Sequence, residues 1–397
     1  MTDKEGRDDV EVKRKIKQSI LVLLLLLGLC GCRMEDIPGV GNLSGVETES
    51  TVTQQQADLY YGYQTLSEEE KQVYRQLMAG LEAFEKEIRV GPIAKDRLEA
   101  VANMVMTDHP EYFWTEGGFR YYEETWPGGG TTGMKALPDY LMSQEAAAQV
   151  KTEIEATAKE WLSGISSDAD TYEKIKYVYE TLIHKVDYDE TSPNNQNIQS
   201  VFLGKSSVCM GYAKATQYLL NRMGIFCTLV TGTVTNGSEA GHAWNLVKIQ
   251  DAYYYVDTTW GNPGYSAAEA SGVDIFYSYL CCNDKMLKPT HKADGTIPLP
   301  VCEDDSYNYY KRKGCWYEGY DRNQMYQELL QTVSAEAHTT ELCFASREAY
   351  DQAVADMVNG TLLQEVVQNT GNLSPGQQVS WQIYYGGWDN LLIIVWN

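Results

Sequence analysis

Three residues in one stretch of the chain could do chemistry together: Cys209, His242 and Asp257. A cysteine thiolate is a nucleophile, a histidine can take up and return its proton, and a carboxylate can hold the imidazole in one orientation. Such a set attacks an amide carbonyl and forms a thioester. Each residue alone is common in protein cores, so the interpretation depends on the elements that place the three side chains.

The sequence around the cysteine predicts a helix from Val208 to Met223, with Ser206 or Ser207 as its N-cap. Cys209 then lies in the first turn, where backbone N–H groups are unpaired and the helix dipole is positive. Both effects favour a thiolate, and the same N–H groups could hold an oxyanion. Gly211 is expected to leave room for a substrate.

Two predicted strands carry the histidine and the aspartate. Residues 225–235 form a first strand, Asn236-Gly237 is a turn, and His242 opens the next strand, which a turn near 250–252 joins to the strand leading to Asp257. Because strand side chains alternate, His242 and Asp257 share a face for any even-length turn. They are then directly opposite or diagonal neighbours, and both registers allow a hydrogen bond. The aromatic residues expected to shield this pair from water are Trp244, Tyr253 and Tyr255.

The segments VCMGYAKATQYLLNRMGI, GHAWNLV and YYYVDTTWG resemble the transglutaminase-like superfamily, whose folds are related to papain-like cysteine proteases. The resemblance covers roughly 172–263, and DHPEYFW and LPVCEDDSYNYY resemble bacterial surface members. It implies that Cys209 is the nucleophile, His242 the general base and acid, and Asp257 the orienting residue. The residues expected in the binding site are Tyr212, Trp244 and Trp260. No acidic loop has calcium-site spacing, so neither calcium nor another cofactor is expected.

The expected fold class is α+β, with a transglutaminase-like or papain-like core in which the nucleophile helix packs on an antiparallel sheet. The expected regions are 1–32, a signal peptide ending in a lipobox; 33–57, a flexible tether; 58–165, a mostly helical N-terminal region; 166–302, the catalytic core; and 303–397, a small C-terminal α+β module.

Local patterns outside the core also make predictions. Ser67 begins a capping box, and apolar residues at helical spacing as far as Ile88 predict one helix that ends before Gly91. Gly117-Gly118 is expected to join two aromatic-rich strands. The C-terminal module is expected to alternate helices and strands and to end in two strands, at 379–385 and 390–396.

The N-terminus has the pattern of an export signal. Basic residues from Lys13 to Lys17 precede a short apolar run, 20–29. This run is about half of the ~20 residues that a spanning helix needs. The following Leu29-Cys30-Gly31-Cys32 resembles the lipobox of bacterial lipoproteins, which implies cleavage before Cys32 and a lipid on that residue. The alternative is an uncleaved anchor helix. Both place the body on the extracellular side of the cell membrane.

Charge and cysteine usage limit the partners. A net charge of −23 argues against nucleic acid or an anionic bilayer as a partner of the folded body.

Outside the leader, the chain has an odd number of cysteines, so at least one thiol is expected to be free. They are Cys209, Cys227, Cys281, Cys282, Cys302, Cys315 and Cys343. Cys302 could pair with Cys315. A metal held by Cys281-Cys282, His291 and Cys302 lacks the paired short spacing of zinc sites, so no metal is expected.

These observations predict an exported, lipid-anchored protein that performs thiol acyl transfer on protein or cell-wall peptides. Attack of water on the thioester gives hydrolysis, and attack of an amine gives cross-linking. The alternative is a non-catalytic surface module that keeps the fold for binding or scaffolding.

Overall fold

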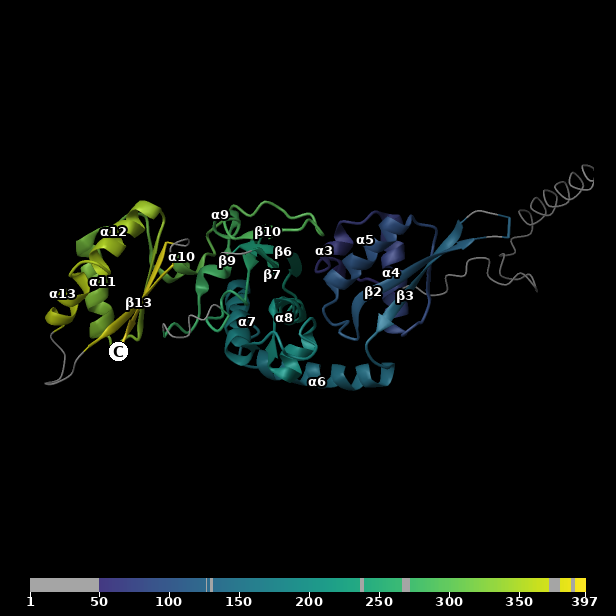
Figure 1. The fold of residues 1–397 in the computed structure, drawn as a ribbon, viewed down its shortest axis with the longest axis horizontal. Helices are drawn as coiled ribbons and strands as arrows, with labels where there is room; N and C mark the ends of the chain where they lie inside the picture. The colour runs from purple at the N-terminus through teal and green to yellow at the C-terminus, as the bar shows by residue number, and fades with distance from the viewer. Residues whose placement is uncertain are drawn as a thin grey trace, which may run out of the picture. The chain divides into compact units, whose positions relative to one another are not determined.

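The computed structural model describes residues 50–125, 127–128, 131–235, 239–265, 272–370, 379–386 and 390–397 (Figure 1). The expected signal peptide, the lipid-bearing Cys32 and most of the expected tether lie outside the described residues, as does the expected turn at Asn236-Gly237. The helices within the described residues are too short or too polar to cross a membrane.

The N-terminal region is mostly helical within the described residues, as predicted, and it also contains a sheet. Its sheet has the order β1-β3-β2. Its elements are α2 (Gln54–Ala57), α3 (Tyr61–Gln64), α4 (Glu68–Glu82), β1 (Ile88–Val90), α5 (Lys95–Asp108), β2 (Thr115–Thr125), β3 (Thr131–Tyr140) and α6 (Gln144–Leu162). Ordered structure begins earlier than predicted, since α2 lies within the expected tether and starts with a capping box at Thr53.

Two local predictions in this region need correction. The helix that starts at the Ser67 capping box ends at Glu82, because Phe84 adopts a left-handed backbone with φ of 56°, and Ile88 begins a strand. Gly117 and Gly118 lie inside the single strand β2, where the pairing register with β3 shifts between Thr115 and Phe119. The glycines therefore form a bulge and not a hairpin turn.

The core is built on an antiparallel sheet in the order β10-β6-β7-β8-β9. Its strands are β6 (Cys227–Thr235), β7 (Glu239–Ile249), β8 (Ala252–Val256), β9 (Leu280–Cys282) and β10 (His291–Ala293). The other elements are α7 (Thr171–Lys185), β4 (Asp187–Tyr188), the π-helical segment Ser200–Gly204, β5 (Ser206–Ser207), α8 (Cys209–Arg222), the 3₁₀ turn Tyr277–Tyr279 and α9 (Asp284–Leu287). Figure 1 shows α8 beside β7, against which it packs. This is the predicted arrangement of a nucleophile helix on an antiparallel sheet.

Buried polar contacts fix α8 on the sheet. The Asn245 side chain of β7 donates from Nδ2 to the carbonyl oxygen of Ala213 on α8, at 2.9 Å. Asn245 is fully buried, and an unpaired Nδ2–H donor there would be costly. This bond therefore sets the distance between the helix that carries the cysteine and the strand that carries the histidine.

The helices and strands predicted for the C-terminal module are present in the structure. It contains α10 (Tyr309–Lys313), β11 (Trp316–Tyr317), α11 (Arg322–Ser334), β12 (Thr339–Phe344), α12 (Arg347–Met357), α13 (Leu362–Asn369), β13 (Trp381–Gly386) and β14 (Leu391–Trp396). The sheet order is β11-β12-β14-β13. The buried residues of β14 are apolar throughout and form the core of the module.

Candidate active site

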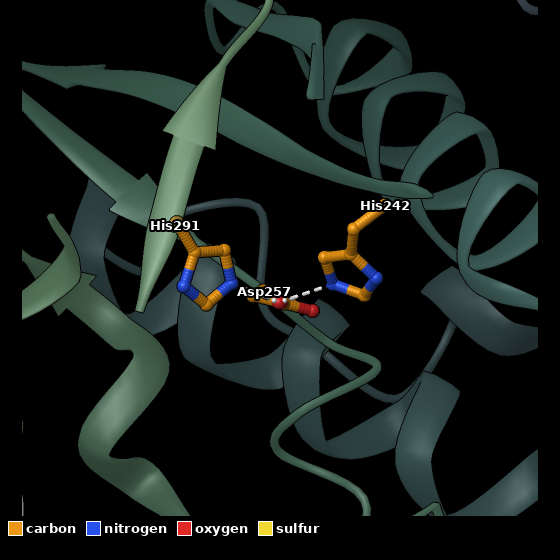
Figure 2. A group of neighbouring side chains, drawn as sticks. All are labelled: His242, Asp257 and His291. Carbon is orange, nitrogen blue, oxygen red and sulfur yellow. Dashed lines mark hydrogen bonds and ion pairs between the residues drawn. The ribbon is translucent and has the colours of Figure 1, made fainter. Parts of the chain in front are cut away.

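His242 and Asp257 form a buried hydrogen-bonded pair (Figure 2). The His242 Nε2 atom lies 2.7 Å from Oδ2 of Asp257, and the two side chains are 2% and 1% exposed. His242 comes from β7, and Asp257 follows directly after β8. The structure therefore brings together the two residues that the strand pattern placed on one face.

The register of β7 and β8 is the diagonal one of the two predicted. Asn245 lies opposite Val256, which places Asp257 opposite Trp244. His242 comes two residues before Trp244 on β7, so its side chain points to the same face as that of Trp244. Asp257 reaches His242 diagonally, as long as the backbone after β8 is held, and a hydrogen bond from the Asp257 N–H to the Tyr279 carbonyl at 3.0 Å helps to hold it.

The surroundings of Asp257 favour its ionised form. Its Oδ1 accepts the backbone N–H groups of Thr259 and Trp260 at 2.9 and 3.0 Å. Its Oδ2 faces His242 and also His291, whose Nε2 lies 3.0 Å away. Burial opposes the charge, but the two histidines outweigh it and hold the pKa of the Asp257 carboxyl well below its usual range. The carboxylate is therefore an acceptor for every group around it.

His242 is correspondingly basic. Burial lowers its pKa, but the charge of Asp257, the hydrogen bond to Asp257 and the nearby Cys209 side chain together raise the pKa from 6.5 to about 10. Because Nε2 contacts Asp257, Nδ1 is the nitrogen left for the sulfur. The ring is thus held by the carboxylate through Nε2, which leaves Nδ1 as the nitrogen that a thiolate–imidazolium pair with Cys209 would use.

Cys209 is the first residue of α8 and is partly exposed, whereas the other described cysteines are buried. The helix begins one residue later than predicted. Its N-cap is Val208, and no side chain caps it. Ser206 and Ser207 do not serve as caps because they form β5, which pairs with β4. The first-turn N–H groups of α8, which have no partners within the helix, lie next to the sulfur.

Two further expectations about α8 are wrong. A side chain at Gly211 would meet the Ser207 hydroxyl at 2.0 Å, so this glycine permits close packing and does not leave room for a substrate. Tyr212 is fully buried, with its hydroxyl bonded to the Val186 carbonyl and to the Asn262 side chain. Tyr212 therefore stabilises the core and has no surface to offer a substrate.

Aromatic rings surround His242, but they are not all the predicted ones. Trp244 stacks on His242 with ring centres 6.1 Å apart, and Trp260 lies at 6.0 Å. Both tryptophans are at most 9% exposed, so they enclose the His242 ring and offer little surface for contact with a substrate. Tyr253 and Tyr255 do not shield the pair, because Tyr253 packs on Phe226 and Tyr255 bonds to Asp284.

The sequence did not single out two tyrosines near the sulfur. Burial raises the pKa of Tyr188, and the nearby Cys209 charge adds to the increase. Burial also raises the pKa of Tyr265, with Asp257 and Cys209 contributing. Tyr188 and Tyr265 meet edge to face at 4.8 Å, and Tyr265 lies 6.3 Å from the His242 ring. They come from β4 and from the segment after β8, so only the folded structure shows their proximity to the thiol.

His291 is the other residue that sequence reasoning missed at this site. The sequence placed it in a weak metal set with Cys281, Cys282 and Cys302. In the structure it lies with His242 and Asp257, and this trio has the composition of a metal-binding group. The atoms are, however, joined at hydrogen-bonding distances through Oδ2. Cys302 and Cys315, whose pairing was left open, are both free thiols.

Residues 156–258, which include Cys209, His242 and Asp257, match the model of the transglutaminase-like superfamily. The chain contains a transglutaminase-like domain. A human protein, kyphoscoliosis peptidase, is 27% identical over 128 residues, which cover 27% of this chain and 19% of that protein. This chain therefore spans about a fifth of the length of that curated relative.

Solved structures of the same kind are also similar to the chain. A TGase is 11% identical, with a TM-score of 0.26, over 36% of this chain and 44% of that one. A candidate cysteine protease from Cytophaga hutchinsonii is 15% identical, with a TM-score of 0.24, over 36% of this chain and 62% of that one. The match to the superfamily model, together with the elements described above, shows a mixed helix and sheet arrangement with a transglutaminase-like core. The strands β9 and β10 lie beyond the residues that match the superfamily.

Proposed function

We propose that this protein is an exported, lipid-anchored enzyme that performs thiol acyl transfer on amide bonds through Cys209, His242 and Asp257. One observation carries the proposal: the His242 ring is hydrogen-bonded to the Asp257 carboxylate, and the Cys209 side chain lies near enough to help raise the pKa of that ring. The start of α8 at Cys209 supports it, because unpaired N–H groups there can receive a developing oxyanion.

The proposed reaction has two steps. The Cys209 thiolate attacks the amide carbonyl carbon and forms a C–S bond. His242 then gives its Nδ1 proton to the departing amine as the C–N bond breaks, which leaves a thioester. In the second step His242 takes a proton from the acyl acceptor, which attacks the thioester, and the cysteine sulfur leaves. Asp257 keeps the imidazole in the orientation that both transfers need.

The acceptor decides between hydrolysis by water and cross-linking by an amine. We favour hydrolysis, because the relative found among curated proteins is by name a peptidase. The substrates that suit an exported site are surface proteins or cell-wall peptides. A net charge of −23 suits basic or neutral substrates and disfavours nucleic acid.

The lipid anchor at Cys32 is a separate part of the proposal. Its support is the basic segment, the short apolar run and the Leu29-Cys30-Gly31-Cys32 sequence. Metabolic labelling with a fatty acid should mark the full chain, and Cys32→Ser should abolish the label and release the protein from the membrane fraction. Labelling that persists in Cys32→Ser would refute the proposal that Cys32 carries the lipid, and it would leave the catalytic proposal unaffected.

Alkylation of the native protein tests the chemistry. Iodoacetamide at neutral pH should modify Cys209 alone among the described cysteines, since the others are buried. His242→Gln should slow this modification about tenfold or more, because the thiolate loses its imidazolium partner. Mass mapping identifies the modified residue, and incubation with a mixed peptide and amine library then distinguishes hydrolysis from cross-linking. A Cys209 that reacts only after unfolding would refute the proposal.

The alternative is a binding or scaffold module that has kept the fold. It would be supported by a Cys209→Ala variant that retains both biological function and partner binding. Under the catalytic proposal, that variant folds normally but loses all turnover.

A further inference from the structure

His291 lies outside the residues that match the superfamily, yet it contacts the centre of the site (Figure 2). It is the first residue of β10, a short strand at the edge of the sheet. Its side chain is fully buried, and its Nε2 lies 3.0 Å from Oδ2 of Asp257. The same oxygen is 2.7 Å from Nε2 of His242. One carboxylate oxygen is thus shared by two imidazoles.

The strand register explains how a residue 34 positions after Asp257 reaches it. His291 lies opposite Val234 of β6, and Val234 lies opposite Ala240 of β7. Ala240 and His242 are two residues apart on one strand, so they point to the same face. His291 therefore shares a face with His242, and the two rings meet edge to face at 5.5 Å.

The second nitrogen of His291 indicates where its proton is. Nδ1 lies 2.8 Å from the Thr290 hydroxyl oxygen, which is closer than the Leu287 carbonyl that the hydroxyl could otherwise reach at 3.2 Å. A hydroxyl that donates to Nδ1 leaves the ring proton on Nε2. Nε2–H then donates to the Asp257 carboxylate, whereas a bare Nε2 would face that negative oxygen without a proton between them.

Aromatic rings surround His291, and within the described contacts its ionic partner is Asp257. Trp260, Trp244 and Tyr279 lie 4.8, 5.1 and 5.8 Å from it, centre to centre. These surroundings exclude water from the shared oxygen. The hydrogen bonds that hold Asp257 in place therefore come from protein groups, and His291 supplies one of the two on Oδ2.

We propose that His291 is a positioning residue for Asp257. Its Nε2–H keeps Oδ2 turned toward His242, and it takes up part of the negative charge on that oxygen. The carboxylate then holds the His242 proton less tightly than it would alone, so that the imidazolium can release the proton to a departing amine. The catalytic meaning of this role rests on the function proposed above.

Proton NMR of the ¹⁵N-histidine-labelled protein tests the role without any substrate. Among the Nε2–H groups, the wild-type protein should show two strongly downfield signals at neutral pH, one from His242 and one from His291. His242→Gln should remove one signal and His291→Phe the other. The His291→Phe variant keeps an aromatic ring at this position but has no hydrogen-bond donor. The remaining His242 signal should then move further downfield, because Oδ2 of Asp257 accepts from His242 alone and no longer from a second imidazole.

A donor at the same position should restore the original state. His291→Gln, whose amide can donate to Oδ2, should return the His242 signal toward its wild-type position. His184→Phe is the matched control, since His184 is half exposed and contacts Asp274. It should leave both signals unchanged. If His291→Phe does not fold, the wild-type spectrum and His291→Gln still decide the question.

Three results would overturn the proposal. One is a wild-type spectrum with a single Nε2–H signal, and another is a His242 signal that does not move downfield in His291→Phe. The third is the absence of both signals until a chelator is added, because a metal bound by the trio would replace both protons. None of these results depends on Cys209 reactivity, so a failure here is separable from a failure of the proposed acyl transfer.

Discussion

The hydroxyl oxygens of Thr216 and Thr258 lie 3.1 Å apart in the buried core. Thr216 belongs to α8, and Thr258 is the neighbour of Asp257 in the chain. The Thr216 hydroxyl also donates to the Tyr212 carbonyl at 2.9 Å, so Thr258 is the donor in the pair. This bond joins the helix that carries the cysteine to the segment that carries the aspartate.

A double-mutant cycle can measure this link. Thr216→Val and Thr258→Val should each cost about 1–2 kcal/mol of unfolding free energy, because each leaves a buried hydroxyl without its partner. The double variant replaces both hydroxyls by methyl groups of similar shape and should cost less than the sum. Urea denaturation provides the values. Strict additivity would mean that the two hydroxyls do not interact.

Asp257→Asn should reduce the reactivity of Cys209. Burial lowers the pKa of His242, and the charge of Asp257 is the largest of the effects that raise it to about 10. Without that charge the pKa of His242 should fall, and fewer molecules should hold the thiolate–imidazolium pair at pH 7. The rate of alkylation by iodoacetamide should drop accordingly. Loss of one partner from a buried pair should also cost about 3–5 kcal/mol of stability.

Asp294→Asn is a suitable control for that experiment. Asp294 follows β10 in the sequence and accepts a hydrogen bond from the Thr231 hydroxyl at 2.7 Å. It undergoes the same change from carboxylate to amide without touching His242. An equal loss of alkylation in both variants would contradict the specific role of Asp257.

Gly232→Ala should displace the strand that carries His291. Gly232 lies between His242 of β7 and Ala293 of β10. A Cβ there would meet the Lys292 carbonyl oxygen at 2.1 Å and the Trp244 ring at 2.8 Å. Such overpacking should cost at least about 1–3 kcal/mol, as measured by urea denaturation.

Gly241→Ala is the matched control for Gly232→Ala. Gly241 is a strand glycine beside His242, and a Cβ at this position would meet nothing within 4 Å. Its stability should be unchanged or rise by up to about 1 kcal/mol. Equal stability of the two variants would show that β10 can shift without cost.

Asp108 should make stability depend on pH between about 4 and 6. Burial raises the pKa of this carboxyl from 3.8 to about 6, although the N–H groups of Gly62 and Tyr63 oppose the increase. A raised pKa contributes stability that is complete below the unfolded value of 3.8 and is lost as the pH rises through about 6. The loss should be on the order of 3 kcal/mol.

The comparison with Asp108→Asn isolates this contribution. The amide does not titrate, so the stability difference between wild type and variant should shrink by that amount from pH 4 to pH 6.5. A constant difference over this range would mean that Asp108 has the same pKa in the folded and unfolded states.

The parts of the site that the sequence predicted are those fixed by local rules. The period of two along a strand placed His242 and Asp257 on one face, and helix-start signals placed Cys209 within one residue of the start of α8. Capping chemistry was less reliable, because Ser206 and Ser207 are drawn into pairing with β4. The pairing depends on a segment some 20 residues away, which local rules do not see.

The parts that the sequence did not predict depend on long-range packing. Tyr212 was assigned to the binding site, but its direction is set by Asn262 and Val186, which lie on other segments. His291 was placed with cysteines because they are close in sequence, whereas the pairing of β10 with β6 decides its real neighbours. The local sequence around a single histidine in a polar segment does not predict which strand that segment pairs with.

The order of the core sheet also bears on where the chain can be shortened. A protein cut at residue 258 would keep the whole stretch that matches the superfamily but lose β9 and β10, which cover β8 and β6. Both sides of the remaining three strands would then offer unpaired N–H and C=O groups to other molecules, a template for edge-to-edge association. The smallest piece expected to stay monomeric and soluble therefore extends past Ala293, so the folding unit is larger than the segment defined by sequence similarity.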